Sequence, residues 1–336
     1  MAGIYQLGKR VVRSGGFQTT GGARFCSGNG NPKSGTAGST IDGLNDGAPK
    51  GSIYINDDTG AAFFNEGTGA SQYWTPVSID QHGLTGVMTD FGNCTGRLGT
   101  ATTTSSLDAS LPSLKYFGKF IDENDANTAM TVSYPLDGPL LTLGTENQDG
   151  GFSALSIGAT TALWKPNVQG TMVIDVNFTG ITDILTRSIF CGFSGTAAAA
   201  MTEPVTGSTT TLTFSATGTE GDNVHGLVMD SQLTSASTFF LATNAADAAA
   251  TQTTTSAALT VAGTMPAAAT YVRLRVEIDT TGAIRAFVNK VLVKTLAAAS
   301  ATVGTALMPV FGQGNTTTTA SLQLGVRHFH AWGTRA

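Results

Sequence analysis

The stretch Tyr271-Val-Arg-Leu-Arg-Val-Glu-Ile-Asp279 decides the fold class of this 336-residue chain. Apolar and charged residues alternate along it, so they lie on opposite sides of an extended chain. The apolar side carries Val272, Leu274, Val276 and Ile278, and the charged side carries Arg273, Arg275, Glu277 and Asp279. This alternation is typical of an antiparallel strand with one face on a core and the other in water. The sequence therefore predicts a half-buried strand with a solvent-facing charged side.

The segments on either side extend this pattern into a sheet. Thr280-Thr-Gly282 predicts a turn, residues 283–288 the returning strand, and Asn289-Lys290 a tight turn into residues 291–296. Thr171–Phe178 alternates in the same way. About a dozen such runs occur, and no segment has a convincing helical period of 3.6 residues. The sequence therefore predicts an all-β, antiparallel two-sheet sandwich rather than a parallel α/β fold.

The composition favours a subunit that packs against neighbours. Charged residues make up 12% of the chain, about half of the ~25% usual in globular proteins. Such a surface has little charge repulsion to keep copies apart. The net charge of −5 argues against binding nucleic acid. The three cysteines (Cys26, Cys94 and Cys191) make a disulfide framework improbable and favour reduced thiols formed in a cytoplasm.

Four segments differ in composition. Residues 1–50 predict an extended, Gly-rich basic arm, and residues 51–77 a small β-hairpin unit. Residues 78–145 predict a linker with irregular β connections, and residues 146–336 the sandwich. The first ten residues have no apolar region, so we expect no signal peptide. No apolar run reaches the ~18 residues of a membrane span, so we expect no membrane partner.

The first two segments carry the candidate anchor residues. The basic ones in the arm are Lys9, Arg10, Arg13 and Arg24, and the aromatic ones in the hairpin unit are Tyr54, Phe63, Phe64, Tyr73 and Trp74. A basic arm fits either an acidic partner surface or a solvated tail. Three short strands are marginal alone, so we expect the aromatic residues to be buried by self-association, with a homotrimer as the best single prediction.

The carboxyl-terminal segment resembles the concanavalin-A-like jelly-roll domains of tailed-phage structural proteins. The similar pieces are Trp164 with Gly170–Val176, then Arg187–Phe193, Asp222–Asp230 and the Val272–Asp279 hairpin. Gly51–Asn56 with Trp74 is similar to a short β motif of phage fibre and decoration proteins. Jelly rolls carry many unrelated functions, so the resemblance implies the fold more firmly than the role.

The resemblance implies a virion structural protein, either a capsid decoration (cement) protein or a head-fibre subunit. It would lie on the outside of the capsid after synthesis in the host cytoplasm, with the major capsid protein, other virion proteins and its own copies as partners. The alternative is a tail fibre or adhesin that recognises a receptor or surface glycan. A carbohydrate-active enzyme is a third interpretation.

The residues give the enzyme interpretation little support. Glycosidases use two carboxylates about 5–9 Å apart, and the strand-borne candidates are Asp175, Glu277 and Asp279. We expect all three to be ordinary solvent-facing residues, and the chain lacks the Glu-x-Asp-x-x-Glu motif of enzymes with this sandwich. We therefore predict no enzymatic activity, no catalytic residues and no cofactor.

Histidine and tryptophan residues provide the remaining site candidates. His328 and His330 share one side of a strand as a candidate metal pair, with His82 and His225 as distant additions. No third ligand is evident beside them, so we predict no metal and a surface or subunit-interface role. Trp74, Trp164 and Trp332 fit either stacking platforms for sugars or residues that cover a β core.

Overall fold

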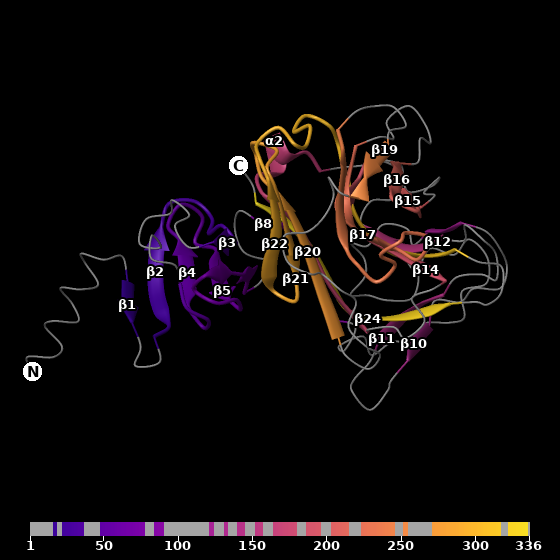
Figure 1. Cartoon of the computed structure of the whole chain (residues 1–336). Coiled ribbons are helices and arrows are strands. Elements are labelled where there is room, and N and C mark those ends of the chain that lie inside the picture. Colours follow the sequence, from indigo (N-terminus) through magenta and orange to yellow (C-terminus); the bar gives the residue numbers. More distant parts are fainter. Residues whose placement is uncertain are drawn as a thin grey trace, which may run out of the picture. The chain divides into compact units, whose positions relative to one another are not determined.

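The computed structural model describes residues 16–18, 22–36, 48–77, 84–90, 121–123, 131–133, 140–144, 152–156, 164–179, 186–195, 203–214, 223–245, 251–254, 271–316 and 322–334. The chain divides into two compact units (Figure 1). The first comprises residues 1–86 with 289–292 and 334–336, and the second comprises residues 87–288 and 293–333. Each unit is described by itself.

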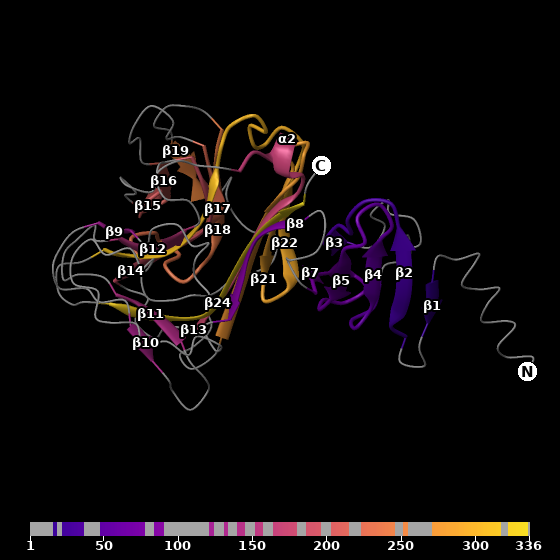
Figure 2. The same cartoon turned by 180° about the vertical axis from the view of Figure 1, so that it is seen from behind.

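The first unit is built on a five-stranded sheet in the order β1-β2-β4-β5-β7 (Figure 2). Its strands are β1 (Gly16–Gln18), β2 (Arg24–Gly28), β4 (Ile53–Asn56), β5 (Ala62–Asn65) and β7 (Trp74–Pro76). β3 (Gly35–Thr36) and β6 (Ser71–Gln72) form a separate pair. The antiparallel β4–β5 hairpin has its turn at residues 57–60 and lies within the hairpin unit that the sequence predicts over residues 51–77. β2, which lies in the segment predicted as an arm, pairs in parallel with β4.

The second unit contains two large sheets. The eight-stranded sheet has the order β10-β11-β24-β13-β20-β21-β22, with β8 also pairing with β24. Its strands are β8 (Leu84–Asp90), β10 (Thr131–Ser133), β11 (Leu140–Gly144), β13 (Met172–Thr179), β20 (Tyr271–Ile278), β21 (Ile284–Val288), β22 (Val291–Leu296) and β24 (Gln323–Thr334). The six-stranded sheet has the order β18-β17-β14-β23-β12-β9. Its strands are β9 (Ile121–Glu123), β12 (Phe152–Ser156), β14 (Arg187–Ser194), β17 (Val224–Asp230), β18 (Phe240–Asn244) and β23 (Met308–Asn315).

A third, smaller sheet packs on the outer face of the six-stranded sheet. It contains β15 (Val205–Ser208), β16 (Thr211–Phe214) and β19 (Thr251–Thr253), which lie beside β17 in both views (Figures 1 and 2). Val205, Leu212 and Phe214 share an apolar cluster with side chains of β14, β17, β18 and β23. The described helix is one turn, α2 (Pro166–Gln169). No helix in the described part of the chain is long and apolar enough to span a membrane.

The main core lies between the two large sheets, and the strand register builds it. β13 pairs antiparallel with β20, so that Ile174 lies opposite Val276 and Val176 opposite Leu274. All four predicted apolar residues of β20 are fully buried, as are the alternating apolar residues of β13. The prediction of an all-β antiparallel sandwich is therefore confirmed.

Two glycines of the six-stranded sheet lie where a side chain would not fit. Gly192 on β14 lies opposite Gly226 on β17. A Cβ atom on Gly226 would lie 2.6 Å from the ring of Phe190, and one on Gly192 would lie 2.3 Å from the backbone oxygen of His225. A side chain at either position would therefore displace backbone or a buried ring.

Replacing Leu274 with Ala tests the core assignment. The side chain is fully buried between the sheets, so its truncation should reduce the free energy of unfolding by about 2–5 kcal/mol. The matched control is Val291→Ala, because Val291 is 46% exposed, and it should change stability by less than about 0.5 kcal/mol. Urea unfolding of both variants measures the difference. Equal effects would show that the core lies elsewhere.

Candidate functional site

The eight-stranded sheet carries charged side chains on the face opposite the main core. Asp175 lies on β13, Arg285 on β21, and Arg273, Arg275 and Glu277 on β20, with Asp279 directly after β20. None of these six residues is more than 9% exposed. We call this set the charged face.

The expectation that Asp175, Glu277 and Asp279 face solvent is therefore wrong. Alternation along a strand determines which side a residue faces, but it does not determine whether that side is covered. Arg273 and Arg275 were expected to be exposed for the same reason, and they too are buried. Three arginines and three carboxylates balance in charge on this face, which makes their burial tolerable.

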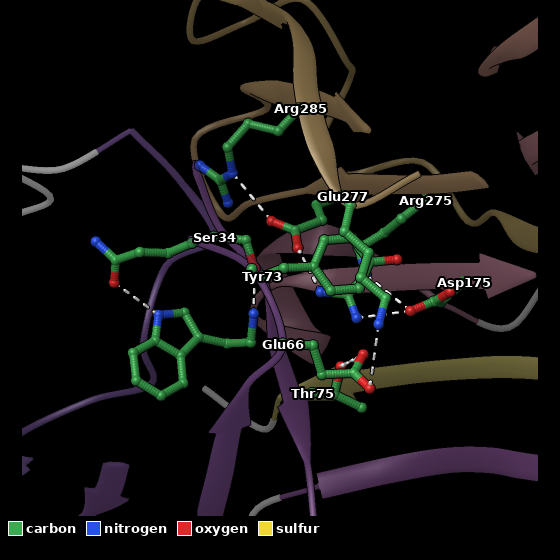
Figure 3. A network of polar contacts seen from close by, with 12 residues as sticks. Ser34, Glu66, Tyr73, Thr75, Asp175, Arg275, Glu277 and Arg285 are labelled. Carbon is green, nitrogen blue, oxygen red and sulfur yellow. Dashed lines mark hydrogen bonds and ion pairs between the residues drawn. The ribbon is translucent and has the colours of Figure 1, made fainter. Parts of the chain in front are cut away.

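Asp175 is the carboxylate that binds Arg275 in the network of polar contacts (Figure 3). Its Oδ1 accepts a hydrogen bond from Arg273 Nε at 2.8 Å, and its Oδ2 accepts one from Arg275 Nη2 at 2.6 Å. Arg273 Nη2 also donates to Oδ2 at 2.8 Å, which makes this pair bidentate. Burial alone would raise the pKa of Asp175, but the two guanidiniums and a hydrogen bond from His328 hold that pKa well below its usual range. Asp175 is therefore a fixed anion.

Glu277 continues the network along the sheet (Figure 3). Its Oε1 lies 3.4 Å from Arg275 Nη1, and its Oε2 accepts a hydrogen bond from Arg285 Nε at 3.0 Å. Arg285 Nη1 then lies 3.4 Å from Asp279 Oδ2. Asp279 Oδ1 also accepts hydrogen bonds from the Thr281 hydroxyl and from the backbone N–H groups of Thr281 and Ala283. Burial raises the pKa of Asp279, yet these hydrogen bonds and Arg285 lower it overall.

The two histidines of β24 lie beside Asp175. Their rings stack with centroids 4.3 Å apart and planes 16° apart, and His328 Nε2 lies 3.4 Å from Asp175 Oδ1. Both are buried in the isolated chain, so the expected surface placement is wrong. His225 belongs to β17 of the other large sheet, and His82 lies outside the described residues. Within the described ranges, no three His, Cys, Asp or Glu side chains gather to hold a metal ion.

The three tryptophans are covered rather than displayed. Trp74, Trp164 and Trp332 are 2%, 7% and 2% exposed. The guanidinium of Arg275 lies 5.1 Å from the centroid of the Trp332 ring, and Trp74 meets Tyr54 edge to face. The sequence left two interpretations open, stacking platforms for sugars or residues that cover a β core, and the burial of all three tryptophans supports the second.

The candidate anchor residues divide into four groups. Lys9, Arg10 and Arg13 lie outside the described residues, and Arg24 is half-buried on β2. Four aromatic residues, Tyr54, Phe63, Tyr73 and Trp74, are already buried in the single chain. Only Phe64 of the five aromatic candidates is exposed, at 39%. The homotrimer stays a prediction, and the buried aromatic residues no longer support it.

Phe64 belongs to a larger exposed face of the five-stranded sheet. It lies opposite Ile53, which lies opposite Phe25, and in the next row Ile55 lies opposite Ala62. Phe25 and Ile55 are 38% and 40% exposed, and Val77 beside Ala62 is 63% exposed. We call Phe25, Ile53, Ile55, Ala62, Phe64 and Val77 the apolar face. The sequence does not reveal most of this face, because Ile53-Tyr-Ile55 and Phe63-Phe64 are apolar on both sides of their strands.

Comparison with known proteins adds likenesses of low similarity. No family model matches the sequence, and no curated protein matches it. The chain is similar to the carbohydrate recognition domain of Emp47p (TM-score 0.42, 11% identity, 74% of this chain and 98% of that chain). It is also similar to Bacillus licheniformis β-glucanase (TM-score 0.41, 12% identity, 75% and 98%) and to a Shewanella oneidensis protein of unknown function (TM-score 0.44, 10% identity, 75% and 87%). Likeness at this level carries no argument about ligand or activity.

The chemistry of the charged face is that of a locked ion network. A glycosidase acid needs a carboxyl group whose pKa is raised, whereas the pKa values of Asp175 and Asp279 are lowered. The oxygens of Asp175 are already bound to guanidinium groups. These carboxylates are therefore placed to hold the sheet rather than to transfer protons.

Replacing Asp175 with Asn tests the network. The change keeps the shape of the side chain but leaves two buried guanidiniums without their anion, so it should cost about 3–5 kcal/mol of unfolding free energy. Asp57→Asn is the control, because Asp57 is exposed, and it should cost less than about 0.5 kcal/mol. Denaturant unfolding at pH 7 compares the two. A small effect at Asp175 would mean that water reaches the network.

The pH dependence of stability gives a second test. Burial lowers the pKa of His328 below its ordinary value of 6.5, and His330 and Arg273 lower it further, against the opposing effect of Asp175. The unfolded chain then binds the proton more readily, so this contribution to stability is complete above pH 6.5 and declines as the pH falls below it. Urea midpoints at pH 7.5, 6.5 and 5.5 should fall more steeply for the wild type than for His328→Gln. Parallel curves would contradict the assignment.

Proposed function

We propose that the protein is a non-enzymatic structural subunit on the outside of a phage capsid, as a decoration protein or head-fibre subunit. The observation that carries the proposal is the apolar face of the first unit, which we infer to be the docking surface. The resemblance of the chain to phage structural proteins supports a location on a phage particle. The low share of charged residues, 12%, supports a subunit that packs against neighbouring subunits.

The make-up of the apolar face favours a protein partner. Its six residues lie in two cross-strand rows, which Thr75 and Ser27 complete: Phe25, Ile53, Phe64 and Thr75, and then Ser27, Ile55, Ala62 and Val77. None of these eight residues is charged, and three of the large apolar ones are each about two-fifths exposed. Contiguous exposed apolar surface marks interaction sites. The fitting occupant is an uncharged, apolar protein surface, which we assign to the major capsid protein or another virion protein.

The charged face supports the non-enzymatic part of the proposal. Its carboxylates are paired with arginines, and the lowered pKa values of Asp175 and Asp279 suit fixed anions rather than general acids. Glycan binding by a tail fibre or adhesin has less support. Sugar sites combine an exposed aromatic ring with directed polar groups. The described tryptophans are buried, and the only polar side chains in the two rows of the apolar face are those of Ser27 and Thr75.

Replacing Phe64 with Asp tests the docking surface. A charge in the middle of the apolar face should weaken attachment to capsids that lack the protein by about 30-fold or more, as the loss of a central interface residue does. Co-sedimentation of purified protein with such capsids measures the affinity. The melting temperature should stay close to that of the wild type, because Phe64 is exposed.

The matched control is Val168→Asp. Val168 is 57% exposed on α2 in the second unit, so the same charge there should leave attachment unchanged. Equal loss in both variants would show a general effect of charge, and no loss in Phe64→Asp would move the docking surface elsewhere. Electron microscopy of intact particles then places the protein on the head or on the tail fibre, and a glycan array tests the alternative.

A further inference from the structure

Two polar side chains of the six-stranded sheet face the inside of the sandwich. His225 lies on β17 two residues before Leu227, on the same side of the strand. Asn223 directly precedes β17, and its backbone oxygen accepts a hydrogen bond from Gly195 N–H, which continues the pairing with β14, so we infer that its side chain lies on the same side. Leu227 belongs to the main core between the two large sheets. Asn223 and His225 are 1% and 0% exposed. They therefore place amide and imidazole groups in the sandwich interior.

The contacts of His225 point to one tautomer of its imidazole ring. Its Nδ1 lies 2.7 Å from Thr243 Oγ1, and Thr243 Oγ1 donates its proton to the Ser300 backbone oxygen at 3.3 Å. We infer that the single proton of this hydroxyl group points to Ser300, in which case Nδ1 carries the proton of the imidazole and donates to Thr243. His225 Nε2 is then a bare acceptor. Burial lowers the pKa of His225 to about 4, so the ring is neutral at pH 7.

Three polar atoms at this place need partners. His225 Nε2, Asn223 Oδ1 and Asn223 Nδ2 are buried, and no hydrogen-bonding group lies in reach of any of them in the described part of the chain. Buried polar groups in proteins are nearly always hydrogen-bonded, either to protein or to ordered water. Nε2 and Oδ1 need a donor, while Nδ2 needs an acceptor.

We propose that Asn223 and His225 form a binding site for internal water. The ligand must both donate and accept hydrogen bonds, which water does. It must also be small and uncharged, since both side chains are closed off from solvent. Residues two apart on a strand are separated by roughly 7 Å, a span that one or two water molecules bridge. An internal water usually makes about three hydrogen bonds, and this site offers three atoms.

A crystal structure of the full chain at high resolution tests the site. The expected result is ordered water within hydrogen-bonding distance of His225 Nε2 and of the Asn223 amide, together with ¹⁵N chemical shifts of the Nδ1-protonated tautomer. Direct hydrogen bonds from these atoms to protein groups would overturn the proposal, as would a space closed by apolar side chains. Density about 2.1 Å from Nε2 would indicate a metal ion instead and would also overturn it.

Two variants separate the roles of the neighbours. His225→Phe removes the acceptor and should remove the water bound to it. Thr243→Val removes only the partner of Nδ1, so water should persist at Asn223 while the tautomer signal shifts towards Nε2–H. Water unchanged in His225→Phe would contradict the assigned site. Should either variant fail to fold, the wild-type structure and its tautomer decide the matter alone.

Discussion

The eight-stranded sheet depends on one buried carboxylate. Asp175 binds Arg273 in a bidentate pair and Arg275 through a 2.6 Å contact, so strand β13 is tied to strand β20 on the side away from the core. The same two strands carry the apolar residues that fill the core on the other side. Removing one member of such a network leaves the others charged and uncompensated. The register of the sheet is therefore held from both faces.

This constraint also limits the chemistry available to the sheet. A face with two carboxylates on neighbouring strands resembles an acid–base site when only residue types are considered. Here the guanidiniums that lower the pKa values of Asp175 and Asp279 also bind the oxygens that a substrate would need. The ion network needs ionised carboxylates, whereas a general acid must be protonated when the reaction begins. The carboxylates of the charged face are arranged for the ion network.

The sequence predicts the fold far better than the site, for physical reasons. Alternation in 271–279 and 171–178 predicts strands β20 and β13 and their core side, since period-two patterns follow directly from strand geometry. It says nothing about what covers the opposite side, so the burial of Asp175 and Glu277 could not be foreseen. The exposure of Phe64 beside the buried Phe63 depends on the pairing of β5 with β4 and β7, and pairing partners are distant in sequence.

In a sandwich one expects charged side chains to face solvent and apolar side chains to be buried, and this protein differs from that expectation. The charged residues of the large sheet are enclosed, while four of the six exposed large apolar residues in the described part of the chain, Phe25, Ile55, Phe64 and Val77, lie on or directly beside the small sheet of the first unit. A protein that bound its partner through the sandwich would have little reason to close that face with an internal ion network. Exposed apolar surface on a small sheet, by contrast, remains unfavourable in water until a partner covers it. The physical argument for binding accordingly favours the first unit.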